Sequence, residues 1–387
     1  MLYFDHNATT PVRPGVLDVV ARAQRDVFGN PSSQHRLGRR ARALLEESRE
    51  RVGAVLDVAA RELVFTSGGT EANLLALELG CRAASDRPLL AVSALEHASI
   101  LDSCRYLEAR QRAKVQVIAS ESSGRVSLSG FEAQLRPETS LLALQHANNE
   151  TGMLQPVTEA AALCHTWRAE RGGRGLLLCD ATQTLGKIPV DPVALGVDLL
   201  SFSSHKIGGP KGAGALWIRP GCLHNVQRGG GPQERGVRPG TENLPAIVGF
   251  AEALELASAA VGDDTASSGF AELVANGLAA RLDGLHLHGG PGPRLGNTVN
   301  VSFEGVPADL LIIRLDEEGV AVSTGSACAS GAREPSHVLQ AMGVPADRLK
   351  GAVRFSAGWS TTSAEIQRLL DVVAGVVTDL RGRLATS

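Results

Sequence analysis

Lys206 stands where a lysine is unexpected, directly after an apolar run and in front of a series of glycines. The segment VDLLSFSSHKIGGPKGAG (197–214) places it behind Ser203, Ser204 and His205. A lysine amine can form an imine with a carbonyl compound, and small neighbours leave room for one. A lone lysine at the end of a strand is more often solvated, so the imine hypothesis needs support from other residues.

Polar side chains also end several other apolar runs. Asp180 follows three leucines in LLLCDATQ, with Gln183 three positions later. A buried carboxylate must be paired or hydrogen-bonded, although an aspartate at this point could simply begin a helix. His97 lies three residues after another apolar run, at 88–94. A buried histidine with ordinary hydrogen bonds is the plainer interpretation of this position. Asn148 and Asn149 follow a third run.

A glycine-rich turn opens one predicted helix. Gly68, Gly69 and Thr70 in FTSGGTEAN precede a periodic leucine pattern. Glycines let the backbone approach a ligand, and a helix N-terminus offers free N–H groups to an anion. The turn therefore predicts a phosphate site, although a nucleotide-binding regulatory module would need such a turn too. The sequence has no G-x-x-x-x-G-K-[ST] motif.

These residues together suit pyridoxal phosphate. That cofactor needs a lysine for an imine, an acid at its ring nitrogen, an anion site and a flat group against its ring. We assign these four tasks, in order, to Lys206, to Asp180, to Gly69 and Thr70 with Ser203 and His205, and to His97.

The elements that must position these residues alternate from about residue 60 onward. Short apolar runs at 62–67, 88–94, 114–119, 141–147, 175–181, 197–203 and 214–219 are separated mainly by amphipathic stretches such as 68–83, 99–112 and 157–171. This alternation is typical of an α/β fold with a mostly parallel sheet flanked by helices. Ligands of such sheets bind at the carboxyl ends of the strands, where the residues above lie.

The pattern changes near residue 255. Segments 296–305, 308–319, 320–327 and 351–358 mix strands and helices, which favours a smaller α+β C-terminal unit. We predict a large cofactor-binding domain at 13–255. The small domain is predicted to combine 1–12 with 256–387.

Composition excludes several function classes. The 387 residues are 43% hydrophobic and 20% charged, with a formal net charge of -3, so we expect no direct nucleic-acid or membrane partner. No C-x-x-C pair occurs among the six cysteines, which argues against a metal site and a disulfide scaffold. The start has no secretory signal pattern and no apolar run could span a bilayer. We expect a cytoplasmic protein with free thiols.

The chain resembles a cysteine desulfurase of the NifS/IscS type, a fold-type I pyridoxal-phosphate enzyme. The resemblance runs nearly end to end. Its motifs occur in family order: FDHNATTPV, FGNPSSQH, FTSGGTEAN, EHAS, HANNETG, DATQTLGK, SFSSHKIGGPKG, RPGTEN, STGSACAS and VRFSAG. The most specific feature is SHK combined with GSACAS far downstream.

The resemblance implies roles for individual residues. Lys206 would form the imine, Asp180 would hold the ring nitrogen and Gln183 would bond the ring oxygen. His97 would stack on the ring and relay protons, and Asn149 would lie near the ring oxygen and the substrate. The phosphate would be bound by Gly69, Thr70, Ser203 and His205. Thr241 would reach the phosphate of a partner subunit, which implies a homodimer, and Arg354 would clamp the carboxylate of L-cysteine.

Cys328 is the expected nucleophile, in a loop rich in serine, glycine and alanine. It would take sulfur from L-cysteine as a persulfide, release L-alanine and pass the sulfur to an acceptor protein. Iron–sulfur assembly, tRNA thiolation and DNA phosphorothioation are all open as destinations. A selenocysteine lyase or an aminotransferase would share the lysine and aspartate, but an aminotransferase has no use for Cys328.

Overall fold

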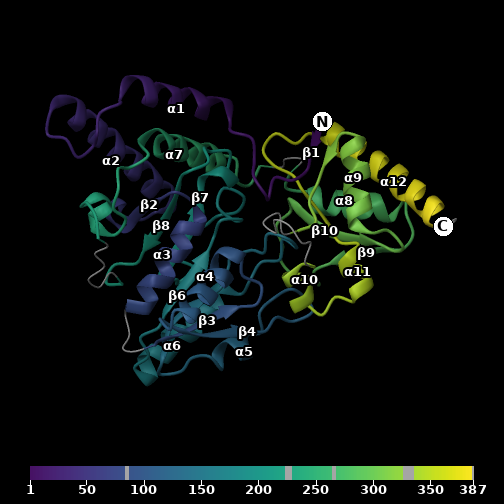
Figure 1. Cartoon of the computed structure of the whole chain (residues 1–387), viewed down its shortest axis with the longest axis horizontal. Coiled ribbons are helices and arrows are strands. Elements are labelled where there is room, and N and C mark those ends of the chain that lie inside the picture. Colours follow the sequence, from purple (N-terminus) through teal and green to yellow (C-terminus); the bar gives the residue numbers. More distant parts are fainter. Residues whose placement is uncertain (83–86, 223–228, 264–266, 326–334, 386–387) are drawn as a thin grey trace.

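The computed structural model describes residues 1–387 except 83–86, 223–228, 264–266, 326–334 and 386–387. The chain forms two lobes, with the larger on the left of Figure 1 and the smaller on the right. Strand β1 at the N-terminus lies in the smaller lobe, so the chain crosses from there to the larger lobe before α1. Cys328 lies outside the described residues.

A seven-stranded sheet forms the centre of the larger lobe, in the order β2-β8-β7-β6-β5-β3-β4. All neighbours from β7 to β4 pair in parallel, whereas β8 is antiparallel to both β2 and β7. The strands are β2 (Leu63–Thr66), β3 (Leu89–Ser93), β4 (Lys114–Ile118), β5 (Thr139–Ala143), β6 (Leu176–Asp180), β7 (Leu199–Ser203) and β8 (Gly214–Ile218). Most of these strands are buried along their whole length, which explains their continuous apolar sequences.

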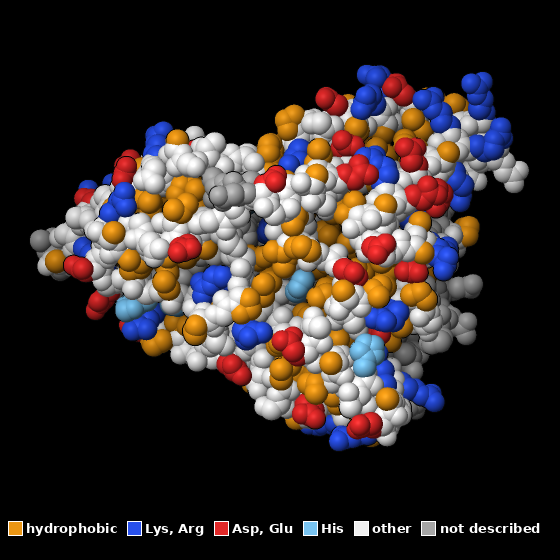
Figure 2. Space-filling model, turned by 180° about the vertical axis from the view of Figure 1, so that it is seen from behind, with side chains coloured by type: hydrophobic (Ala, Val, Ile, Leu, Met, Phe, Trp, Pro, Cys, Tyr) orange, Lys and Arg blue, Asp and Glu red, His pale blue; other side chains and the backbone are white. Residues whose placement is uncertain are grey.

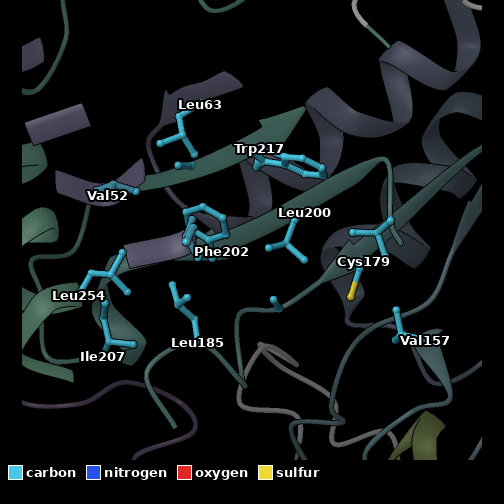
Figure 3. Packing of buried hydrophobic residues seen from close by; sticks show 14 of the residues in the cluster. Val52, Leu63, Val157, Cys179, Leu185, Leu200, Phe202, Ile207, Trp217 and Leu254 are labelled. Atoms are coloured by element: carbon cyan, nitrogen blue, oxygen red, sulfur yellow. The ribbon is translucent and has the colours of Figure 1, made fainter. Parts of the chain in front are cut away.

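Helices cover this sheet on both faces. They are α1 (Pro14–Asp26), α2 (Arg36–Leu56), α3 (Gly69–Arg82), α4 (Ala98–Ala109), α5 (Leu128–Glu132), α6 (Val157–Arg171) and α7 (Leu244–Ala259), with 3-10 turns η1 (Ala60–Glu62), η2 (Ser204–Lys206) and η3 (Gln233–Gly236). Figure 3 shows Leu200 and Phe202 of β7 beside Trp217 of β8 in one of the apolar layers. This packing holds the end of β7, where Ser203 lies and the turn with Lys206 follows.

The smaller lobe is an α+β unit. Its three-stranded sheet has the order β12-β10-β9, and β1 pairs in parallel with β11. The elements are β1 (Leu2–Tyr3), α8 (Phe270–Ala279), β9 (Leu285–His288), β10 (Thr298–Phe303), α9 (Ala308–Glu317), β11 (Val320–Ala321), α10 (His337–Ala341), α11 (Ala346–Lys350), β12 (Val353–Ser356) and α12 (Ser363–Ala385). Leu2 and Phe4 share an apolar cluster with α8, α9, β10, β12 and α12.

The α/β fold class predicted from the sequence is confirmed. The predicted boundary, residue 255, falls within α7, and the division into two domains remains a prediction. Basic and acidic side chains are interspersed over the face shown in Figure 2. Within the described part of the chain, no helix is long and apolar enough to cross a membrane, and no group of His, Cys, Asp or Glu residues could hold a metal ion.

Candidate active site

The carboxyl edge of the large sheet gathers the polar residues that end its parallel strands. Asp180 is the last residue of β6, and Ser203 is the last residue of β7. His97 follows β3 by a short turn and is the N-cap of α4. Parallel strands present their carboxyl ends at one edge, so these side chains come from far-apart sequence positions to one place.

Asp180 is held by a buried hydrogen-bond network. Its Oδ2 accepts from Asn73 Nδ2 at 2.8 Å, and its Oδ1 accepts from the backbone N–H of Thr182 at 2.9 Å. Asn73 also donates to Ser99 Oγ at 2.9 Å and accepts from Ser201 Oγ at 2.5 Å. Asp180 precedes a series of turns and not a helix, so it does not act as a helix N-cap. The network fixes a carboxylate at the base of the site.

His97 is a neutral group next to this network. Burial lowers its pKa, the charge on Asp180 acts in the opposite direction, and the charge on Lys206 lowers it further. Its Nδ1 accepts from the backbone N–H of Ser99 at 3.1 Å and lies 2.9 Å from Ser99 Oγ. A neutral imidazole whose Nδ1 accepts carries its proton on Nε2. In that tautomer the Nε2–H group can donate from the side of the ring that faces away from Ser99.

Lys206 reaches across to the N-terminal segment. It ends η2, and its Nζ donates to the carbonyl oxygens of Asn7 at 2.5 Å and Ala8 at 2.7 Å. The same Asn7 carbonyl accepts from Gln183 Nε2 at 3.1 Å. The amine is therefore held between the large sheet and the segment that arrives from the smaller lobe.

The N-terminus of α3 forms a cradle of the kind expected for phosphate. Gly69 is its first residue, and a Cβ there would lie 3.1 Å from Thr182 Oγ1 and 3.5 Å from Ser203 Cβ. Thr182 Oγ1 is buried without a hydrogen-bond partner among the described residues. An unused hydroxyl, a helix N-terminus and Ser203 can together satisfy the oxygens of a phosphate.

His205 borders this cradle as a neutral donor. Burial, followed by the charges of Lys206 and Lys211, lowers its pKa to about 4. Its Nδ1 lies 3.1 Å from Thr9 Oγ1. When the Thr9 hydroxyl donates to Nδ1, the Nε2–H group of the ring is free to donate to an anion. Amine, carboxylate and anion cradle together fit pyridoxal phosphate.

Arg354 brings a positive charge from the smaller lobe to the site. It lies on β12 and is 1% exposed. Nη2 pairs with Asp5 Oδ1 at 2.6 Å, and Nη1 donates to the carbonyls of Asn149 and Gly325, each at 3.0 Å. These three bonds use three of the five guanidinium donors, and Nε has no partner in the part of the chain described. Two donors are left, enough for one carboxylate.

Comparison with known proteins decides the family. The class-V aminotransferase model matches residues 2–369. A cysteine desulfurase of Cereibacter sphaeroides is 42% identical, covering 98% of this chain and 96% of that protein. A solved NifS-like protein matches with a TM-score of 0.88 and 34% identity, covering 98% and 99%. The chain belongs to the cysteine desulfurase family of class-V aminotransferases. Its cofactor is pyridoxal phosphate.

A further family structure contains the amino acid itself. The structure described as SspA in complex with cysteine matches with a TM-score of 0.79 and 31% identity, covering 92% of this chain and 98% of that one. The resemblance identified from the sequence motifs is thereby confirmed. The roles of individual residues stay predictions.

Among the described residues, the side chains of three predicted residues of this desulfurase-family chain make no hydrogen bond to the gathered group. Thr70 is exposed at the second position of α3, and Thr241 is exposed on the segment before α7. Asn149 meets the site through its backbone carbonyl, which accepts from both Asn7 and Arg354. The described residues provide no hydrogen bond between Thr241 and the group around Lys206.

Five cysteines of this family member are described, and none is a ready nucleophile. Burial is the largest cause of a raised pKa in each case. The pKa is about 12 for Cys104 and Cys164 and about 11 for Cys222, well above the ordinary value for Cys179, and raised for Cys81. Because the thiolate is the reactive form, a raised pKa makes each of these thiols a weaker nucleophile at neutral pH than an ordinary cysteine.

Sequence reasoning assigned no role to Asn7, Asn73 and Lys187, which join the network. Asn73 lies on α3 and is 1% exposed. Its place among the apolar residues of a predicted helix is a sequence signal for a buried polar role. Asn7 and Lys187 lie in motifs quoted for the family resemblance. Their contacts depend on how the N-terminal segment meets the larger lobe, which no local pattern predicts.

Proposed function

We propose that this chain is a cysteine desulfurase that uses Lys206 and Cys328 to move sulfur from L-cysteine onto itself. In the balanced reaction, L-cysteine and the Cys328 thiol give L-alanine and a persulfide on Cys328. The carbon–sulfur bond of the substrate breaks, and a sulfur–sulfur bond forms. The observation that carries the proposal is the convergence of the Lys206 amine, the Asp180 carboxylate and the α3 cradle at one sheet edge.

Pyridoxal phosphate, when bound, supplies an electron sink that labilises bonds at the substrate's α-carbon. Asp180, fixed by Asn73 and Thr182, would keep the ring nitrogen protonated. Lys206 would hold the cofactor and move the α-proton with its Nζ. His97 would assist as a neutral imidazole with its proton on Nε2.

The substrate carboxylate would be held by the two remaining donors of Arg354. A guanidinium is suited to this task because it offers parallel N–H groups. Its pair with Asp5 and its bonds to two carbonyls hold the side chain in one position. The substrate's α-carbon would then face Lys206.

Cys328 is proposed as the sulfur acceptor of the first half-reaction. The raised pKa of each of the other five thiols supports this assignment, because it makes them poor nucleophiles. The motif STGSACAS, which contains Cys328, supports it as well.

A homodimer with shared active sites is part of the proposal. Thr241 is exposed on its own subunit, which is compatible with contact to a partner's phosphate site. The persulfide sulfur would go to an acceptor protein in the cytoplasm. Iron–sulfur assembly, tRNA thiolation and DNA phosphorothioation all remain candidates for its destination.

The test is incubation of the holoenzyme with L-cysteine and dithiothreitol, with alanine and sulfide both measured. Equal amounts of the two products are expected, and Lys206→Ala and Cys328→Ser should each lower the rate by more than about 100-fold. Cys222→Ser is the matched control and should keep the parental rate. Pyruvate with ammonia as products, or full activity of Cys328→Ser, would contradict the proposal.

A further inference from the structure

Lys187 is a second lysine beside the site, and the roles given above do not use it. Its Nζ donates to Gln183 Oε1 at 3.0 Å and to Asn7 Oδ1 at 3.2 Å. Both acceptors are side-chain amides whose other ends face the site. Lys187 lies at the end of the turns that follow Asp180, and its backbone N–H bonds to the Thr184 carbonyl at 3.0 Å.

An ammonium group has donors and no acceptor, so it fixes the orientation of an amide that it contacts. The oxygen of Gln183 must face Lys187, and its NH₂ group must face the opposite way. That NH₂ group donates to the Asn7 carbonyl at 3.1 Å. Asn7 is oriented likewise, because its Nδ2 donates to the Asn149 carbonyl at 3.0 Å and to Thr298 Oγ1 at 2.8 Å.

The network leads directly to the catalytic lysine. Lys206 Nζ and Gln183 Nε2 share the Asn7 carbonyl as their acceptor. Lys187 is therefore one hydrogen bond away from Gln183 and two away from Lys206, through Asn7. Burial, with the charges of Lys206 and Arg354, lowers the pKa of Lys187 to about 7. The ammonium form therefore fixes both amides, whereas the neutral amine keeps two N–H groups for the two amide oxygens but gains a lone pair that can also accept.

We propose that Lys187 is a positioning residue that turns the NH₂ group of Gln183 toward the ring oxygen of the cofactor. The inference rests on the proposed function and on the contact of Gln183 with that oxygen, which the family resemblance implies. A ring oxygen is an acceptor and gains nothing from an amide that presents its own oxygen. A donor at the ring oxygen stabilises its deprotonated form and lowers the pKa of the bound cofactor chromophore.

The test is a pH titration of the cofactor's visible absorption in the Lys187→Met holoenzyme. Loss of the oriented donor and of a nearby cation both favour the protonated chromophore, so its pKa should rise by about one unit. In a Gln183→Ala background the same substitution should add less than about a third of that shift, because Lys187 acts through Gln183. Lys114→Met, at an exposed position on β4, is the control and should leave the pKa unchanged.

Lys187→Gln provides a second measurement if the methionine variant folds poorly, and a smaller rise in pKa is expected because one donor group remains. An unchanged chromophore pKa in a folded variant would overturn the inference, as would an equal shift in the Gln183→Ala background. Either result would overturn only the role of Lys187, because neither bears on whether the wild-type protein is a desulfurase. A wild-type protein that gives no cofactor absorption would instead contradict the proposed function.

Discussion

The two halves of the active site are assembled in different ways. The strand-end half consists of Asp180, Asn73, Ser201 and His97, all on or next to elements of the large sheet. The joining half is made by the N-terminal segment and by β12 of the smaller lobe. Asn7 of the N-terminal segment accepts from Lys206 and Gln183 and donates to Asn149. Arg354 of β12 pairs with Asp5 and also donates to Asn149.

Both halves contact residues proposed to serve the cofactor, but the proposed substrate clamp, Arg354, belongs to the joining half alone. The Asp180 carboxylate at the base of the site is held within the larger lobe, by Asn73 of α3 and by the turn after β6. The proposed substrate clamp belongs to the lobe junction, where the N-terminal segment and the smaller lobe meet. A substitution in the strand-end half should therefore lower kcat, and one at Arg354 in the joining half should act mainly on substrate binding.

The largest effect is expected at Arg354. Arg354→Lys keeps the charge opposite Asp5 but loses the fork that would hold a carboxylate. We expect kcat/KM for L-cysteine to fall about 100-fold, mostly through KM. Steady-state kinetics at equal cofactor content measure this. An unchanged KM would remove Arg354 from substrate binding and break the comparison.

A smaller effect is expected at Asn73. Asn73→Ala removes a donor from Asp180 and leaves Ser99 and Ser201 without their shared partner. We expect kcat to fall about 10-fold with little change in KM, because a hydrogen bond to a charged group stabilises by about 1.5 kcal/mol. Asn276→Ala on the exposed face of α8 is the control. A change confined to KM would show that the two halves are not distinct.

A third effect concerns the stability of the region beside the strand-end half and not catalysis. Glu96 is buried next to His97, and burial is the main cause that raises its pKa to about 8. Between pH 5 and 8 the folded protein keeps a proton that the unfolded chain has lost, so the free energy of unfolding falls as pH rises. The slope reaches about 1.4 kcal/mol per pH unit.

Glu96→Gln is neutral at every pH and should lose this part of the slope. Its Oε1 can still accept from the Gln145 N–H group, which lies 2.8 Å away in the parent. Urea unfolding of both holoenzymes at pH 5.5, 6.5 and 7.5 measures the difference. Parallel stability curves for the two proteins would show that Glu96 is ionised in the folded state.

The sequence predicted the strand-end half better than the joining half. Asp180 and His97 follow apolar runs, and the geometry of parallel sheets implies that such residues meet. Asn7 and Lys187 are joined only when the N-terminal segment packs against the larger lobe, a tertiary contact that no periodicity encodes. The roles of Thr241 and Cys328 stay predictions, since one depends on a second subunit and the other lies outside the described residues.

The central claim is that sulfur passes from L-cysteine to Cys328 with Lys206 in the site. Its most direct test mixes the holoenzyme with one equivalent of L-cysteine per site without reductant, followed by peptide mass spectrometry and alanine measurement. We predict one added sulfur atom on the Cys328 peptide and one alanine per site, and neither product in Lys206→Ala. Alanine formed without sulfur on Cys328, or with sulfur on another cysteine, would contradict the account.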